Sequence, residues 1–208
     1  VNSATTATVG HGLGRAPTFI IHKVLNASGW HFFRGIPGMT SATTVRDMNP
    51  NGSPTDVSGS GGALVAPTST VFNINNYTGI GGGGFNYVAY CWAPIEGYSS
   101  FGNFTGNGNA DGPYIYTGFR PKTVLTIGEA YGNENFIFDT TRNPNNPTDN
   151  YLRWGRNSGE TADSTSALIS VFSNGFKIKG SNADINGSGG NKLSAAWVDV
   201  PWKYNNTF

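Results

Sequence analysis

Short apolar segments bounded by Gly, Pro and Asn recur along the whole chain, and each has the length of a β-strand. The segments 18–24 and 122–128 are almost continuously apolar, which is typical of strands buried on both faces. The segments 112–117 and 175–179 alternate apolar and polar residues, which predicts strands with one face in water. The predicted strands cover residues 18–24, 30–34, 69–75, 85–92, 112–117, 122–128, 135–140, 175–179 and 192–199.

Helical periodicity is weak throughout, and the run at 166–172 fits either a helix or a strand. Two long polar stretches, 35–68 and 140–165, are predicted to be loops. Loops of this length usually carry function or form interfaces. Short strands joined by Gly- and Asn-rich connections predict an all-β protein with antiparallel sheets, of the sandwich or jelly-roll type.

The predicted strands form two sets that repeat at an almost constant spacing of about 104 residues. Segment 17–21 matches segment 121–125 at an offset of 104, and Trp92 matches Trp197 at an offset of 105. Five segments match in the same order. The repeat predicts two tandem β-sandwich or jelly-roll-like domains, over residues 1–98 and 99–208.

Composition and charge narrow the range of partners. Gly, Asn, Ser and Thr make up 92 of the 208 residues, and only 12% are charged, against about 25% in an average soluble domain. The net charge is +1 and neither half is strongly basic, so we expect no nucleic-acid partner. No apolar run reaches 18 residues, so we expect no membrane insertion. Because the chain starts at Val1, we expect it to be a portion of a longer protein.

Few residues offer the chemistry of an active site. His22 and His31 lie in apolar strands, where a packed histidine is commoner than a metal ligand. Cys91 lies in an apolar run and is expected to be a buried small side chain rather than a nucleophile. The segment 139–149 is rich in oxygen ligands and is compatible with calcium, but it lacks EF-hand spacing, and Asx turns explain it equally well. We expect no catalytic residue, no cofactor and no metal site.

Aromatic residues beside polar loops are the candidates for a contact surface. Tyr131, Tyr151 and Trp154, together with Arg156, are predicted to contact a glycan or another subunit. The alternative is that these rings anchor their loops onto the sandwich. Trp92 and Trp197 occupy equivalent strand positions and are expected in the core.

Several motifs, in a fixed order, resemble a known group of sequences. GHGLGRAPTFIIHKV at 10–24 resembles a signature of distal tail-fibre and virion domains of tailed bacteriophages. TGNGNADGPYIYTGFRPKTVLTIGEA at 105–130 resembles the same element in the second repeat. With further matching segments, nearly the whole chain is similar to an uncharacterised tandem β-domain of marine tailed-phage structural proteins, often found beside lectin modules. The chain departs from that pattern before Gly10, where an aromatic lead-in like 101–107 is missing.

The resemblance implies a non-enzymatic structural protein of a virion, most readily a tail-fibre or host-attachment module. Its expected partners are further copies of itself, as a trimer in many fibres, other virion proteins and a host surface glycan. A carbohydrate-binding module for receptor recognition and a capsid decoration protein are alternatives. A glycan depolymerase is less favoured, because no pair of carboxylates flanked by aromatic residues is visible.

Overall fold

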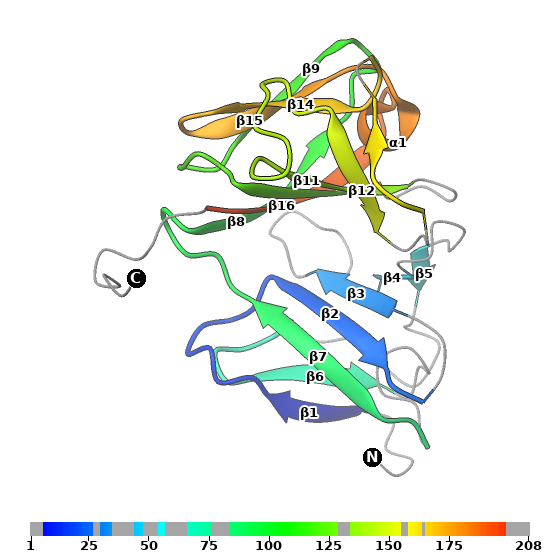
Figure 1. Ribbon diagram of the computed structural model, residues 1–208. Coiled ribbons are helices and arrows are strands. Elements are labelled where there is room, and N and C mark those ends of the chain that lie inside the picture. Colours follow the sequence, from blue (N-terminus) through cyan, green and yellow to red (C-terminus); the bar gives the residue numbers. More distant parts are fainter. Residues whose placement is uncertain are drawn as a thin grey trace. The chain divides into compact units, whose positions relative to one another are not determined.

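The computed structural model describes residues 6–26, 30–34, 44–47, 54–56, 66–75, 84–128, 134–154, 158–163 and 165–198. Within these ranges the protein is mostly β-strand in antiparallel sheets, with almost no helix (Figure 1). The contacts divide the chain into two compact units, the first running to Pro94 and the second starting at Ile95. No helix in the described ranges is long and apolar enough to cross a membrane.

The first unit contains a five-stranded sheet and a two-stranded sheet. The larger sheet has the order β5 (Pro54–Asp56), β4 (Thr44–Asp47), β3 (Trp30–Arg34), β2 (Phe19–Val24) and β7 (Tyr87–Trp92). The smaller sheet pairs β1 (Thr6–Gly10) with β6 (Val71–Asn75). Residues of both sheets meet in one apolar cluster, because Ile20 of β2 packs with Phe72 and Ile74 of β6.

The second unit contains a six-stranded sheet and a three-stranded sheet. The six-stranded sheet has the order β13 (Thr161–Ala162), β12 (Asn150–Trp154), β11 (Asn135–Asp139), β10 (Thr123–Gly128), β16 (Asn191–Trp197) and β8 (Ser99–Thr105). The three-stranded sheet has the order β14 (Leu168–Phe172), β15 (Gly175–Lys179) and β9 (Asp111–Tyr116). A single helical turn, α1 (Ala183–Asn186), precedes β16 and begins at the N-cap residue Asn182.

The core of the second unit lies between its two sheets. Val171 and Phe176 point inward from the three-stranded sheet, while Phe136 and Phe138 point inward from the six-stranded sheet. All four side chains are almost completely buried. The alternation of apolar and polar residues along β15 therefore has the predicted cause, since Phe176 and Ile178 face the core while Lys177 and Lys179 point to the other side of the sheet.

The outer edge of β14 is covered by the chain itself. The Asn146 side chain binds the Val171 backbone at both ends, accepting from its N–H at 2.9 Å and donating to its carbonyl at 3.0 Å. Thr148 and Ile169 exchange two backbone hydrogen bonds, of 2.7 and 3.1 Å. At the other edge of this sheet β9 contains Pro113, which has no N–H to offer to a further strand. Both edges are thus protected against uncontrolled strand pairing.

The strand prediction is confirmed, since each of the predicted strands matches an observed strand to within two residues at either end. The ambiguous run at 166–172 forms strand β14. Strands β1 and β8 were not predicted. In β8 the sequence SSFGNFT has a central glycine and few aliphatic residues, so its strand character comes from pairing with β16.

The prediction that 35–68 and 140–165 are loops is wrong in part. These stretches contain the strand pairs β4–β5 and β12–β13, which extend the larger sheet of each unit. These strands are short and lie within polar stretches, and pairing with β3 and β11 extends the sheets through them.

Candidate functional site

The outer face of the three-stranded sheet carries three exposed aromatic side chains. Tyr114, Tyr116 and Phe172 are 45%, 68% and 42% exposed. They occupy alternate positions on β9 and the end of β14, so they point away from the core. Between them lies Gly175 of β15, which pairs with Tyr116 on one side and Phe172 on the other. We call Tyr114, Tyr116 and Phe172 the aromatic face.

Gly175 makes this arrangement possible because it has no side chain. The ring of Tyr114 meets that of Phe172 edge-on, with centroids 5.9 Å apart and an interplanar angle of 62°. The Tyr114 hydroxyl donates a hydrogen bond of 2.5 Å to Oδ1 of Asn174. A Cβ atom at Gly175 would lie 2.6 Å from that hydroxyl and 2.3 Å from the carbonyl oxygen of Ile115. Any larger residue would displace both the tyrosine and the neighbouring strand.

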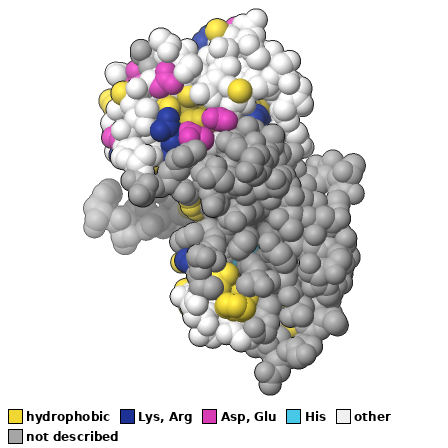
Figure 2. All heavy atoms as spheres, turned by 90° about the vertical axis from the view of Figure 1, so that its right-hand side faces the viewer, with side chains coloured by type: hydrophobic (Ala, Val, Ile, Leu, Met, Phe, Trp, Pro, Cys, Tyr) yellow, Lys and Arg dark blue, Asp and Glu magenta, His cyan; other side chains and the backbone are white. Residues whose placement is uncertain are grey.

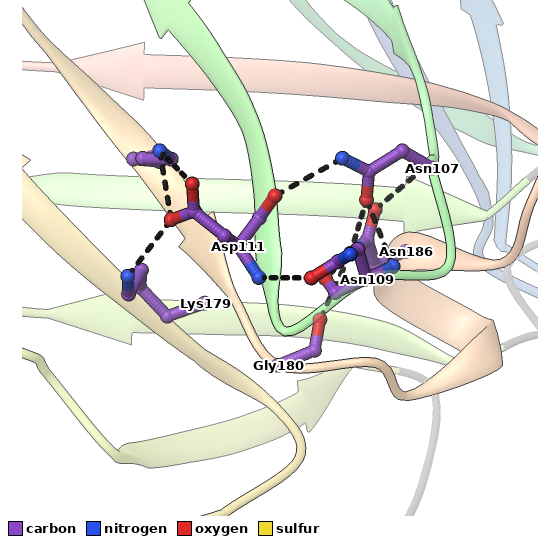
Figure 3. A network of polar contacts seen from close by, with 7 residues as sticks. Asn107, Asn109, Asp111, Lys179, Gly180 and Asn186 are labelled. Carbon is purple, nitrogen blue, oxygen red and sulfur yellow. Dashed lines mark hydrogen bonds and ion pairs between the residues drawn. The ribbon is translucent and has the colours of Figure 1, made fainter.

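A charged cluster lies on the same side of the sheet (Figure 3). The Asp111 carboxylate accepts a hydrogen bond of 2.8 Å from Lys177 and one of 3.0 Å from Lys179. The bonds from Lys177 and then Lys179 hold the pKa of Asp111 below its ordinary value. Lys177 lies directly opposite Tyr114 in the strand register. The cluster therefore places two ammonium groups and one carboxylate beside the aromatic face.

The start of β9 is fixed by a buried asparagine, Asn186 of α1 (Figure 3). Its Oδ1 accepts from the backbone N–H of Asn107 at 3.0 Å. Its Nδ2 donates to Oδ1 of Asn107 and to the carbonyl oxygens of Asn109 and Gly180, at 3.1, 2.7 and 2.9 Å. The amide of Asn186 thus joins the turn before β9 to the end of β15.

The four residues predicted to make contacts are placed differently. Tyr151 is only 3% exposed and packs edge-on against Phe136 at 4.9 Å, so it belongs to the core and presents no surface to a glycan. It does so because the supposed loop is strand β12, on which Tyr151 faces inward. Trp154 is half-buried at the end of the same strand. Tyr131 and Arg156 lie outside the described residues.

Tyr114, Tyr116 and Phe172 were not singled out from the sequence. The alternation in PYIYTG did predict a wet face there, but the approach of Phe172 depends on pairing between distant segments. Trp92 and Trp197, expected in the core, are half-buried. Trp92 stacks on Tyr90 with centroids 6.2 Å apart, and Trp197 meets Phe101 edge-on at 5.5 Å.

The oxygen-rich segment 139–149 uses its side chains within the loop. Asp139 accepts from the N–H of Thr141 at 2.8 Å, and Asn143 accepts from the N–H of Asn145 at 3.0 Å. Asn143 also donates to the carboxylate of Asp149. These are the Asx turns proposed as the alternative to calcium. Among the residues that the structure describes, no group of three or more His, Cys, Asp or Glu side chains is placed to hold a metal ion.

The contacts of His11 and His22 and the burial of Cys91 give these residues structural roles. His11 accepts from the N–H of Leu13 at its Nδ1, and its Nε2 therefore donates to the carbonyl of Thr68, both at 3.1 Å. His22 is 3% exposed and meets Phe72 edge-on. The side chain of His31 lies outside the described residues. Burial raises the pKa of Cys91 to about 11, so its thiol is protonated at neutral pH.

An open cavity of about 440 Å³ lies in the second unit, lined by residues that include Phe119, Arg120, Lys122, Thr140 and Ser173. Ser173 directly follows Phe172 of the aromatic face. Arg120 donates to the carbonyl of Val171 at 3.4 Å and is otherwise exposed. On the surface shown in Figure 2, described basic and acidic side chains lie beside one another rather than in a patch of one sign.

Asp163, in the turn that leads into β14, should make the stability of the second unit sensitive to acid. Partial burial alone would raise the pKa of Asp163, but hydrogen bonds from Ser166 and Thr165 outweigh this and lower it to about 2. Because the folded pKa is depressed, the stabilisation is present above about pH 4 and is lost as the pH falls towards 2. After allowance for solvent screening it amounts to about 1 kcal/mol.

We therefore expect Asp163→Asn to lower the free energy of unfolding at pH 7 and to differ little from the wild type at pH 2. Urea unfolding across this pH range measures both values. A stability difference that is equal at pH 7 and pH 2 would show that the charge of Asp163 plays no part.

Comparison with known proteins gives one kind of match. The family model described as Domain of unknown function (DUF7483) matches residues 1–201. No curated protein and no solved structure matches the chain.

Proposed function

The chain belongs to the family described as Domain of unknown function (DUF7483), and we propose that it is a non-enzymatic structural protein of a bacteriophage particle. In this proposal it forms part of a tail fibre or similar host-attachment appendage on the virion surface and assembles with further copies of itself. The link to phage particles comes from the sequence resemblance at 10–24 and 105–130. The structural role is supported by strand-pairing registers that match between the two units.

The pairing registers favour two tandem copies of one antiparallel β domain. In the first unit Phe19 pairs with Trp92, and in the second unit Thr123 pairs with Trp197, which are the positions expected from offsets of 104 and 105. The same correspondence holds at the outer strands. Thr44 pairs with Asp56, and 106 residues further along the chain Asn150 pairs with Ala162. The agreement of register at both the inner and the outer strand pairs is the observation that carries the proposal. A slip of one residue in either unit would turn the inward-facing side chains of that strand to the opposite face of the sheet.

Inward-facing residues agree between the two copies. Phe72 and Ile74 of β6 correspond to Phe176 and Ile178 of β15, and all four are buried. The two units thus share inward-facing residues while their outer faces differ. Such a fold is suited to a structural module, because its surface contacts can differ without loss of the core that stabilises it.

The loops and the charge also suit an assembled, extracellular protein. Side-chain amides and carboxylates tie several loops to the strands, as Asn146 does at β14 and Asn186 does at β9. These loops are therefore held to the strands by side-chain hydrogen bonds. A net charge of +1 over 208 residues gives little repulsion between copies.

Self-assembly is tested by the mass of the purified chain in solution, measured by light scattering after size-exclusion chromatography. We expect a closed homo-oligomer, with a mass near three times 22.0 kDa for a trimer. The mass should be the same at low and high salt, because few charged groups are available for the contacts. A single mass of 22.0 kDa at all concentrations would contradict the assembly proposal.

A further inference from the structure

We propose that the aromatic face of the second unit, together with Lys177 and Lys179, binds a glycan that carries a carboxylate or another anionic group. This goes beyond the structural role proposed above and does not require it. The face lies on a sheet whose two edges are already protected, so its exposed surface is the open side of the sheet rather than a strand edge.

The exposed groups have the chemistry of a sugar site. The exposed large apolar side chains among the described residues of the second unit are the three rings of the aromatic face. Such rings offer flat faces to the C–H groups of a sugar ring. Beside them lie hydrogen-bonding side chains, including Asn174, whose Oδ1 holds the Tyr114 hydroxyl. The ring of Tyr114 is fixed by this bond and by its contact with Phe172, so little conformational freedom is lost on binding.

The size of the face favours a small ligand over a second copy of the chain. At about 200 Å² per aromatic residue, the exposed fractions of the three rings amount to about 300 Å². A standard protein interface buries about 800 Å² on each partner, counting all atoms, so these rings alone do not make a stable contact between copies.

The charges beside the rings favour an anionic ligand. Lys177 and Lys179 share a single carboxylate, that of Asp111, so the cluster retains one net positive charge. Arg120, at the end of the face where Ser173 follows Phe172, adds a further exposed cation. Asp111 holds both ammonium groups in place, and an anionic group on a sugar would accept further hydrogen bonds from them.

The first unit provides an internal comparison, which depends on the proposed repeat. At the positions of Tyr114 and Tyr116 it has Thr8 and Gly10, judged by the pairing with β6. At the positions of Lys177 and Lys179 it has Asn73 and Asn75. The buried residues between them agree in type, as described above. In this comparison the rings and the lysines therefore belong to the solvent face of the second unit and have no counterpart at the matching positions of the first.

The test uses the full chain on an array of matched oligosaccharides, each acidic member printed beside its neutral counterpart, such as oligogalacturonate beside its methyl ester. We expect binding to acidic members and little to the neutral ones. Titration calorimetry with the best acidic oligosaccharide should show an affinity lowered at least about tenfold by the double variant Tyr116→Ala/Phe172→Ala. Lys177→Gln should abolish the preference for the acidic member. Tyr90→Ala removes a tyrosine of the first unit that is also 45% exposed, and should leave binding unchanged.

Three results would overturn the proposal. One is the absence of binding to any acidic oligosaccharide by a chain whose circular dichroism shows it to be folded. The second is an affinity that falls as much with Tyr90→Ala as with the double variant. The third is a wild-type chain that is an oligomer and a double variant that is a monomer, because the aromatic face would then be a contact between copies. A wild-type chain that binds the glycan as a monomer would contradict self-assembly and leave the glycan site in place.

Discussion

Replacing Asn186 by alanine should lower the free energy of unfolding of the second unit by about 3 kcal/mol, because it removes all the hydrogen bonds of a buried amide. The Asn186 side chain is fully buried, and its amide makes four hydrogen bonds with Asn107, Asn109 and Gly180. Without it, the N–H of Asn107 and the carbonyl of Gly180 lose the partner that the side chain supplies. The turn before β9 and the end of β15 would then be joined by backbone hydrogen bonds alone, such as that from the Gly180 N–H to the Ala110 carbonyl at 2.8 Å.

Hydrogen exchange measured by mass spectrometry locates this effect. Protection should fall first in 105–112 and 178–190, which are the segments that Asn186 joins. Asn186→Asp should be similarly unstable, since a carboxylate in place of the amide NH₂ would face carbonyl oxygens. Asn145→Ala is the matched control, because Asn145 is exposed and should change stability by less than about 0.5 kcal/mol. Equal unfolding midpoints for Asn186→Ala and Asn145→Ala would contradict this account of the network.

Gly175→Ala should destabilise the second unit by about 2–4 kcal/mol and disturb the aromatic face. The added Cβ would lie 2.3 Å from the carbonyl oxygen of Ile115, and backbone cannot move aside as a flexible side chain can. Strands β15 and β9 must then separate locally, and the Tyr114 hydroxyl must leave its position 2.6 Å from the new atom. Both the melting temperature and glycan binding should fall.

Gly159→Ala is the control for the loss of a glycine. No atom lies within 4 Å of a Cβ at Gly159, so its melting temperature should be unchanged or slightly raised. If Gly175→Ala melted at the same temperature as Gly159→Ala, the close packing of Tyr114 over β15 would be disproved.

The sequence predicts most of the strands because their alternation and their Gly and Pro boundaries are local features. The proposed repeat would also relate β2 to β10 and β7 to β16, and the pairs Phe19–Trp92 and Thr123–Trp197 lie at the offsets that it requires. The sequence does not predict β12, a short strand within a polar stretch that pairs with β11. Tyr151 was consequently expected at the surface, although the strand turns it into the core.

The aromatic face could be predicted only in part. The alternation in PYIYTG indicates that Tyr114 and Tyr116 share a solvent-facing side. Phe172 reaches them from a strand more than fifty residues later, and Gly175 between them gives no signal by itself. Such a surface depends on long-range pairing, which the sequence pattern of any one segment does not specify.

Electron cryo-microscopy of virions purified from a culture that produces this chain tests the proposed structural role most directly. We predict several copies of the chain in a tail fibre or another attachment appendage, arranged about a symmetry axis. In that arrangement neighbouring copies should cover the segments 35–68 and 140–165. A particle without the chain, or one that carries isolated copies with both segments free, would contradict the proposal.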